Sequence, residues 1–428
     1  MEVEDTGRTI PRRSLLRGAA RGASAIITAS AFGPTMSHLE RRAAAQEATQ
    51  VRLTGAPSSP EESRLLEQVL QDFEAKFLDI TVLWEPVTQQ YAEKLQTDLA
   101  AGTAADVFYV DSLLSPDLAA RGVLLPLDEP MAEVGVTADD FYAGLIEAFQ
   151  WEGRTYGLPK DWSSLAMVYD PQAFDGAGIV APPTTWDELR SVAQALFDAT
   201  GQAPIILPPD FARFIVFLYQ AGGAVIGNDG SVAIDSPETR QALDFYYGLY
   251  KDGLAATPAD VGAQWPGDAF AKDLGVIVFE GNWMFPFLAA SAPDKRFLIA
   301  ELPAGPAGKV TMGFTVSYSI NAKATVPESA WELVNYLTGP EGMARWTDLG
   351  LAMPSRPALA EAWIATYPER EPYLAGGAYA RPWQLGPGGQ AFFQDANAIL
   401  EAVFAGQTES QDAVTQFAEK AVADIKIT

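Results

Sequence analysis

The sequence contains no cysteine and a single histidine, His38. Without cysteine the chain forms neither disulfide bonds nor thiolate metal sites, and it cannot carry the lipid of a cysteine-anchored lipoprotein. His38 lies in a segment that we assign below to export, so the rest of the chain lacks the histidine of a Ser-His-Asp triad, a Cys-His pair or a usual zinc site. Glycosidase chemistry is not excluded, because it needs only two carboxylates about 5–10 Å apart and neither cysteine nor histidine.

Basic residues are also scarce, because the chain has 29 Lys and Arg against 55 Asp and Glu, a formal net charge of −26. Residues 1–45 hold seven arginines and four acids, which leaves 22 of the basic and 51 of the acidic residues in the remainder. A surface this acidic repels nucleic-acid phosphates and anionic lipid headgroups. We therefore expect no nucleic-acid partner.

The N-terminus lacks the run of about 20 apolar residues that a membrane-spanning helix needs. Residues 11–17 read Pro-Arg-Arg-Ser-Leu-Leu-Arg, residues 22–36 are mildly apolar, and the three alanines at 43–45 offer a small-residue cleavage site. This pattern predicts a twin-arginine export signal over residues 1–45, and a protein in the periplasm or at the extracellular face of the cytoplasmic membrane. An uncleaved amphipathic tail or membrane anchor is the alternative.

With 428 residues, 48% of them hydrophobic, the chain is long enough for two or three domains. Apolar runs at 51–54, 80–84 and 106–110 predict strands. The segments between them predict helices, the first of which starts at a capping box that begins with Ser59. The order βαβαβ is typical of an open parallel sheet, in which ligands bind beyond the carboxyl ends of the strands.

Aromatic and acidic side chains follow the second and third of these strands, at Trp84-Glu85 and at residues 109–112, Tyr-Val-Asp-Ser. Each aromatic ring could instead pack in the core or at its rim. Their position after the strands makes ligand binding about as well supported as packing. Asp111 is the preferred carboxylate for the hydroxyl groups of a solute.

Residues 151–174 contain two local signals. Glu152-Gly153 predicts a tight hairpin, because glycine accepts positive φ, and the apolar run 165–169 predicts a buried strand that ends at Asp170-Pro171. This segment resembles the signature of family 1 of the extracellular solute-binding proteins, the receptors of ATP-driven sugar importers. The matching residues are Pro159, Asp161, Ala166, Met167, Val168, Tyr169, Asp170 and Phe174, whereas Lys160 and Gly176 depart from the pattern.

A second α/β unit follows this segment. Within it, Gly281-Asn282-Trp283 comes directly after a predicted buried strand and resembles the family's Gly-x-Trp loop, whose Trp stacks on sugar. The resemblance covers about residues 50–425. The predicted strands of this part are 204–207, 274–279, 297–302 and 316–321, and its predicted helices are 186–199, 211–221, 238–251, 330–338, 391–404 and 410–425.

The resemblance implies an α/β protein with the two-lobed, type II periplasmic-binding-protein fold, in which each lobe is a sheet flanked by helices and hinge strands join the lobes. The N-lobe would hold residues 46–166 and 303–357, and the C-lobe residues 167–302 and 358–428. The crossings would lie near residues 165–169, 298–303 and 354–359.

The same resemblance implies an extracytoplasmic substrate-binding protein of an ABC transporter. It would be a monomer without cofactor, metal site or catalytic activity, and it would bind a carbohydrate, expected to be an oligosaccharide, and deliver it to the permease subunits. A same-fold receptor for a polyamine, a glycerol phosphate ester or a peptide is the first alternative. An exported, carboxylate-dependent glycosidase or lyase is the second.

Sugars present apolar C–H faces and rings of hydroxyl groups, so a receptor needs aromatic plates beside charged or amide groups. A solute that contacts both lobes would also link binding to closure of the lobes. The candidate binding residues are Trp84, Glu85, Tyr109, Asp111, Ser112, Tyr156, Asp161, Trp162, Asp210, Asn282, Trp283, Phe314, Arg356 and Trp383.

Overall fold

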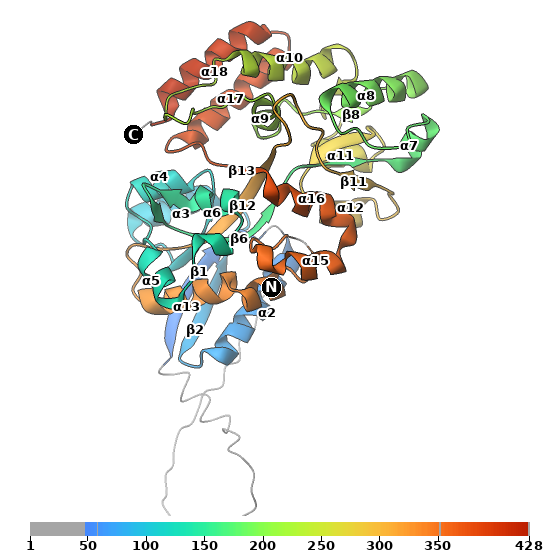
Figure 1. The fold of residues 1–428 in the computed structure, drawn as a ribbon. Coiled ribbons are helices and arrows are strands. Elements are labelled where there is room, and N and C mark those ends of the chain that lie inside the picture. Colours follow the sequence, from blue (N-terminus) through green and yellow to red (C-terminus); the bar gives the residue numbers. More distant parts are fainter. Residues whose placement is uncertain (1–47, 58, 351, 427–428) are drawn as a thin grey trace, which may run out of the picture. The chain divides into compact units, whose positions relative to one another are not determined.

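The strands of the described residues form two large sheets (Figure 1) and, apart from these, one hairpin. This computed structural model describes residues 48–57, 59–350 and 352–426, which belong to one compact unit, Glu47–Thr428. The predicted export signal, residues 1–45, lies outside the described residues. Within the described ranges, every helix is too short or too polar to cross a membrane.

The predicted βαβαβ unit is confirmed, and it forms half of the first sheet. The strand order is β13-β12-β3-β1-β2, with β6 also paired to β12, and β1 runs parallel to both β2 and β3. The first helix starts as the capping box predicts, because Ser59 Oγ accepts the backbone N–H of Glu62 and Pro60 takes the first helical position. The elements are β1 (Thr49–Gly55), α2 (Pro60–Lys76), β2 (Ile80–Pro86), α3 (Tyr91–Ala101) and β3 (Val107–Asp111).

The strand predicted at 316–321 begins five residues earlier, since β12 spans Thr311–Ile320. β12 runs antiparallel to β3 and β6 (Leu158–Ser163) and parallel to β13 (Ala380–Pro382). Its first residues resemble a loop in the sequence because they include Gly313. In the fold this glycine is needed, because a Cβ there would lie 2.8 Å from the Leu145 side chain.

The second sheet has the order β11-β7-β10-β8-β9. Only Ser164 and Leu165 separate β6 of the first sheet from β7 of the second, so the chain passes between the sheets there. It returns between β11 and β12. The strands of this sheet are β7 (Ala166–Tyr169), β8 (Ile205–Ile206), β9 (Ala255–Ala256), β10 (Ile277–Glu280) and β11 (Leu298–Ala300).

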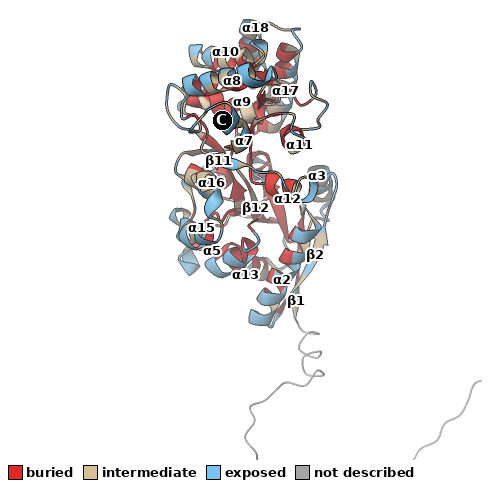
Figure 2. Ribbon diagram, turned by 90° about the vertical axis from the view of Figure 1, so that its right-hand side faces the viewer, coloured by how far each residue is buried: buried red, intermediate tan, exposed pale blue. Residues whose placement is uncertain are grey.

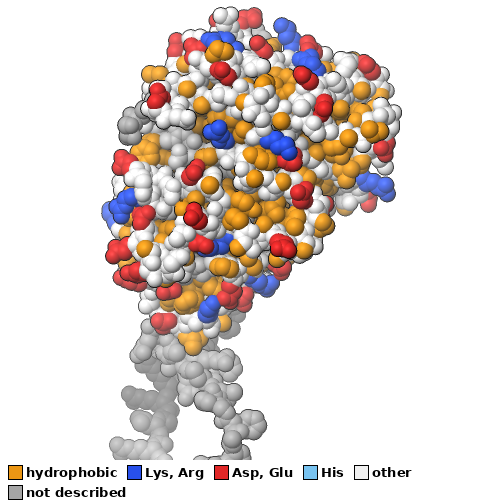
Figure 3. All heavy atoms as spheres, viewed as in Figure 1, with side chains coloured by type: hydrophobic (Ala, Val, Ile, Leu, Met, Phe, Trp, Pro, Cys, Tyr) orange, Lys and Arg blue, Asp and Glu red, His pale blue; other side chains and the backbone are white. Residues whose placement is uncertain are grey.

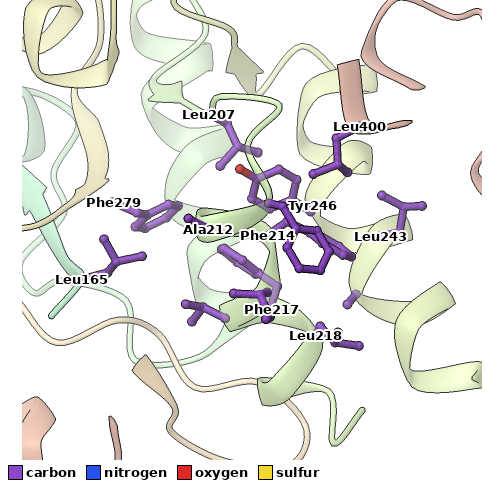
Figure 4. Packing of buried hydrophobic residues seen from close by; sticks show 14 of the residues in the cluster. Leu165, Leu207, Ala212, Phe214, Phe217, Leu218, Leu243, Tyr246, Phe279 and Leu400 are labelled. Atoms are coloured by element: carbon purple, nitrogen blue, oxygen red, sulfur yellow. The ribbon is translucent and has the colours of Figure 1, made fainter. Parts of the chain in front are cut away.

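A shared apolar core lies under the helices of the second half of the chain. Phe214, Phe217 and Tyr246 gather there (Figure 4), and the rings of Phe217 and Tyr246 meet edge to face with centroids 5.0 Å apart. Five of the six helices predicted in this half are confirmed within two residues, whereas the helix predicted at 330–338 begins at Pro327. They are α8 (Trp186–Thr200), α9 (Phe211–Gln220), α10 (Pro237–Lys251), α17 (Gly389–Phe404) and α18 (Ser410–Asp424).

A second core lies between the first sheet and the helices α2, α13 (Pro327–Thr338) and α14 (Pro340–Trp346). Figure 2 shows the buried strands and the exposed outer faces of the helices. The hairpin predicted at Glu152-Gly153 is confirmed, with φ of 47° and 74° at these residues. In the part of the chain that the structure describes, the remaining elements are five 3₁₀ turns and β4 (Gln150–Trp151), β5 (Arg154–Thr155), α4 (Ser115–Ala120), α5 (Asp128–Val134), α6 (Ala143–Ile146), α7 (Pro171–Gly176), α11 (Pro266–Ala271), α12 (Met284–Ser291), α15 (Ala360–Thr366) and α16 (Glu371–Ala375).

The predicted C-lobe segment 358–428 is divided between the two halves of the structure. Its helices α17 and α18 join the core of the second half, whereas β13 pairs with β12 at the edge of the first sheet. The surface agrees with the composition, since Figure 3 shows acidic side chains dispersed over the visible face among fewer Lys and Arg. The chain is thus an α/β protein with two helix-flanked sheets, as the sequence predicts.

Candidate functional site

A cavity of about 270 Å³ opens where strand ends from both sheets meet. The first sheet contributes the ends of β3 and β6 and the middle of β12, and the second contributes the loop after β10. The lining residues are Ala56, Glu62, Leu65, Tyr109, Asp111, Lys160, Asp161, Trp162, Ser163, Asn282, Trp283, Phe314, Thr315, Val316, Trp346 and Ala352.

Asp111 ends β3 and presents its carboxylate to the cavity. One carboxylate oxygen accepts the backbone N–H of Leu113 at 2.9 Å. Asp111 is exposed to the cavity, but the protein around it displaces part of its water. This desolvation raises the pKa of Asp111 to about 6, although the hydrogen bond from Leu113 acts in the opposite direction. Among the described residues, no Lys or Arg forms an ion pair with this carboxylate.

Tyr109 lies two residues before Asp111 in β3 and also lines the cavity. Its ring is buried edge to face against Tyr318, with centroids 5.2 Å apart. The ring also lies so close to Gly55 that a Cβ there would be 2.6 Å away, so only glycine fits. Burial therefore raises the pKa of Tyr109 well above its ordinary value, and the phenol stays neutral.

Lys160 is a buried cation in the wall of the cavity. Its ammonium forms an ion pair with Asp161, lies 3.4 Å from Glu62 Oε1, and stands 4.0 Å from the ring centroid of Trp346. Trp346 Nε1 in turn donates to Asp161 Oδ2 at 2.7 Å. Burial alone would lower the pKa of Lys160, but the two carboxylates outweigh burial and raise it, so the side chain stays charged.

Trp283 faces the cavity from the loop after β10. Its indole Nε1 donates to Glu280 Oε2 at 2.8 Å, and Arg213 donates to both oxygens of the same carboxylate at 2.9 and 2.8 Å. Gly281 lies flat beneath the ring, where a Cβ would be 2.2 Å from the indole. Glu280 is fully buried, and desolvation raises its pKa although Arg213 opposes the shift.

Two contacts join the sheets across the cavity. The rings of Trp283 and Phe314 of β12 meet edge to face, with centroids 5.6 Å apart and planes at 78°. The backbone N–H of Asn282 donates to Ser163 Oγ at 3.0 Å. Aromatic and polar groups from both sheets therefore already lie within reach of one small solute.

The structure brings seven of the fourteen predicted residues to the lining of the cavity. They are Tyr109, Asp111, Asp161, Trp162, Asn282, Trp283 and Phe314. Asn282 and Trp283 follow β10 and Asp111 ends β3, whereas the other four lie within β3, β6 and β12. Trp162 shows little of its ring, because the side chain is buried and its Nε1 donates to the carbonyl of Pro354 at 3.0 Å.

The structure places the other seven predicted residues outside the cavity lining. Trp84 packs on the second core and donates to Ser63 Oγ at 3.2 Å, and Glu85 binds the guanidinium of Arg52. Tyr156 packs beside Trp151 against the cluster under β3. A predicted position after a strand is therefore not sufficient, since a side chain can turn toward a neighbouring element instead.

The remaining four residues of that set have structural partners close to the cavity or elsewhere. Asp210 caps α9 and pairs with Arg213, and Trp383 is buried against Phe314, with ring centroids 5.6 Å apart. Arg356 is buried and donates to the carbonyl of Thr338 at 2.6 Å. Ser112 is fully buried, and its hydroxyl has no hydrogen-bond partner among the described residues.

Sequence reasoning missed five polar or aromatic lining residues: the hydroxyl residues Ser163 and Thr315, and also Glu62, Lys160 and Trp346. Glu62 was taken only as part of the capping box of α2. Lys160 was visible as a departure from the family signature, which could have marked it as specific to this chain. Trp346 gave no local signal, because it ends α14 and its partner Asp161 is 185 residues away.

No group of three or more His, Cys, Asp and Glu in the described ranges is placed to hold a metal ion. The site therefore consists of aromatic faces, carboxylates, one ammonium group and backbone polar groups.

The sequence profile of the bacterial extracellular solute-binding proteins matches residues 68–372. The chain belongs to this family. A protein of Brucella abortus (strain 2308) that is named as a binding protein is 29% identical over 324 residues, which are 71% of this chain and 76% of that protein. The maltotriose-binding protein of Pyrococcus abyssi (strain GE5 / Orsay) is 25% identical over 246 residues, 57% of this chain and 51% of that protein.

Solved structures show the same two-lobed fold as this solute-binding protein. An ABC substrate-binding protein from Listeria monocytogenes, in complex with cycloalternan, has a TM-score of 0.78 at 21% identity and covers 89% of this chain and 100% of its own. UgpB from Mycobacterium tuberculosis, in complex with glycerophosphocholine, has a TM-score of 0.76 at 21% identity and covers 88% of this chain and 98% of its own. The fold is therefore common to receptors of different solutes, and the lining of the cavity must decide which one this chain binds.

Proposed function

We propose that this solute-binding protein takes up a carbohydrate in the cavity and delivers it to the permease subunits of an ABC importer. The observation that carries the proposal is the composition of the lining. Trp283, Phe314 and Trp346 supply aromatic faces for the apolar side of a sugar ring, and Asp111 and Asp161 supply acceptors for its hydroxyl groups. The name of the maltotriose-binding relative supports the same solute class.

The size of the cavity supports a small bound unit. At about 270 Å³ it lies near the lower end of the range of about 300–1,000 Å³ that is usual for ligand pockets. We therefore propose that the enclosed part takes one end of an oligosaccharide, and that the rest of the solute extends along the opening between the sheets.

The charges of the lining disfavour a phosphate ester. Phosphate sites use arginine side chains or helix N-termini, and no arginine lines the cavity in the described ranges. A polyamine remains the second candidate, because its cationic groups would suit the carboxylates of Asp111 and Asp161. We propose that no bond of the solute is broken, in agreement with a family of binding proteins.

The lobe assignment also remains a proposal. We propose an N-lobe of residues 46–166 and 303–357 and a C-lobe of residues 167–302 and 358–428, with β13 as a strand of the C-terminal segment that pairs into the first sheet. The protein would act as an exported monomer, either in the periplasm or at the extracellular face of the cytoplasmic membrane.

Calorimetric titration tests the proposal. The purified chain is titrated with neutral oligosaccharides of one to four units, with polyamines and with glycerol phosphate esters. We expect saturable binding of at least one oligosaccharide and none of the phosphate esters. Binding of a phosphate ester alone would overturn the carbohydrate assignment, and new reducing ends in the recovered sugar would show an enzyme instead.

A further inference from the structure

The cavity has an excess of negative charge. Its ionisable carboxylates are Glu62, Asp111 and Asp161, and its one cationic side chain in the described ranges is Lys160. The ammonium of Lys160 is fully engaged, because it pairs with Asp161, lies 3.4 Å from Glu62 and stacks on Trp346. It therefore offers no charge to an anionic solute.

Asp111 differs from the other two carboxylates because it has no cationic partner. The carboxylate of Asp111 makes one hydrogen bond to the described residues, in which Oδ1 accepts the backbone N–H of Leu113 at 2.9 Å. Desolvation raises the pKa of this carboxyl to about 6, so its ionised form lacks the compensation that Lys160 gives to Asp161. A cation supplied from the cavity would provide this compensation.

The two tryptophan rings Trp346 and Trp283 are weak competitors for such a cation. Lys160 stands 4.0 Å from the centroid of the Trp346 ring, and the guanidinium of Arg213 stands 5.6 Å from that of Trp283. Each ring already has a protein cation near one face, which leaves it less attractive to a second cation. These rings therefore suit the uncharged C–H face of a sugar, and Asp111 is left as the group that can attract a cation.

We infer that the solute is a carbohydrate that carries a protonated amine, and that Asp111 binds this amine and thereby selects it over neutral and acidic sugars. The inference rests on the proposed function for the sugar part of the solute. It goes further by naming the charge of the solute and the residue that recognises it. Acidic sugars would be excluded because they would face three carboxylates and a lysine that is already paired.

A matched set of solutes tests the inference. Oligosaccharides of glucosamine, their N-acetylated counterparts and uronic-acid oligosaccharides of equal length are titrated into the full chain at pH 7. We expect the amine form to bind about tenfold more tightly than the N-acetylated form, which is the order of a charge-assisted hydrogen bond. The uronic acids should show no saturation.

Two variants assign the effect to its residue. Asp111→Asn removes the charge but keeps the shape of the side chain, so the ratio of the two affinities should fall to about one. Asp139→Asn is the matched control, because it removes one carboxylate from an exposed position outside the cavity, and it should keep the tenfold ratio. Folding of both variants is checked by thermal unfolding before titration.

The outcomes separate the inference from the proposed function. Equal binding of the amine and N-acetylated forms would overturn the inference and leave the carbohydrate function standing. A preference that persists in Asp111→Asn would overturn the role of Asp111. If no sugar binds, spermidine is titrated into the wild type and Asp111→Asn; binding lost in the variant would retain the amine site and reject the sugar, and no binding would reject both.

Discussion

The indole Nε1 of Trp283 donates a 2.8 Å hydrogen bond to the carboxylate of Glu280, three residues earlier and fully buried. Arg213 holds the same carboxylate through two contacts of 2.9 and 2.8 Å, and Gly281 lets the ring lie flat on the backbone. The orientation of the proposed stacking plate is therefore set by a buried ion pair. Glu280 does not line the cavity, so it would affect binding only through Trp283.

A double-mutant cycle should detect this coupling. Trp283→Phe keeps an aromatic face and removes the N–H donor, and Glu280→Gln removes the charge that anchors Arg213. Each single change should weaken solute binding by about 1 kcal/mol, but Glu280→Gln should cost nothing further in the Trp283→Phe background. Titration calorimetry of the four proteins measures this. Additive losses would show that Glu280 acts on binding by another route, and Glu85→Gln is a control outside the cavity.

Truncation of the plate itself should be more costly. Trp283→Ala is expected to lose about 1–3 kcal/mol of binding free energy, because the apolar face of the solute would lose a large aromatic surface. The half-buried position of Trp283 predicts a smaller change in the free energy of unfolding. Calorimetry and urea unfolding of the same variant give both values. An unchanged affinity would show that Trp283 serves packing and does not stack on the solute.

Binding should depend on pH through Asp111, whose pKa desolvation raises to about 6. The ionised carboxylate supplies the negative charge that attracts the amine. Affinity should therefore be full above pH 7, fall as Asp111 is protonated near pH 6, and level off about tenfold lower. Asp111→Asn should flatten this profile. Titration between pH 5 and 8 is the measurement, and a profile that stays steep in the variant would assign the effect to another group.

The same group predicts the opposite effect on stability. Because the pKa of Asp111 is higher in the folded than in the unfolded state, the folded state binds more protons between about pH 4 and 6. Its contribution to the free energy of unfolding therefore falls as pH rises through this range. At pH 7, Asp111→Asn should unfold at higher urea and gain about 1 kcal/mol, a modest value because the side chain is open to the cavity. Lower stability of the variant would contradict this.

Removal of Lys160 should destabilise the fold strongly. Lys160→Met would leave Glu62 and Asp161 buried without their cation, which costs about 3–5 kcal/mol for a buried ion pair. Lys76→Met is the matched control, since Lys76 and Glu341 form an exposed pair that is worth less than about 1 kcal/mol. Urea unfolding compares the two variants. Equal and small losses would show that Lys160 is not an important charge in the fold.

Closure should accompany binding, because the cavity takes groups from both sheets. The rings of Phe314 and Trp283 meet across the cavity, and the backbone N–H of Asn282 donates to Ser163 Oγ, which also joins the two sheets. A solute that contacts both sides stabilises the state in which they are closest. Small-angle scattering with saturating sugar should show a smaller radius of gyration than without sugar. Trp283→Ala at the same sugar concentration is the control, and an unchanged radius in the wild type would count against closure.

The sequence by itself predicted the elements whose signals are local. The capping box at Ser59 and Pro60 sets the start of α2, and the Glu152-Gly153 turn needs the positive φ that it adopts. The order βαβαβ placed Tyr109 and Asp111 at the end of a parallel strand, where the cavity is found. These features depend on residues only a few positions apart, so periodicity and turn chemistry determine them.

Only the tertiary structure decided which side chains meet. Lys160 and Glu62 are 98 residues apart, and Asp161 and Trp346 are 185 residues apart, so no local pattern pairs them. Trp84 lies in β2 and Trp283 follows β10, yet Trp84 turns into the second core and Trp283 faces the cavity. The direction of each ring depends on its hydrogen-bond acceptor and on the space left by distant elements. Long-range packing therefore decided which of the predicted site residues line the cavity, because burial and pairing are properties of the assembled sheets.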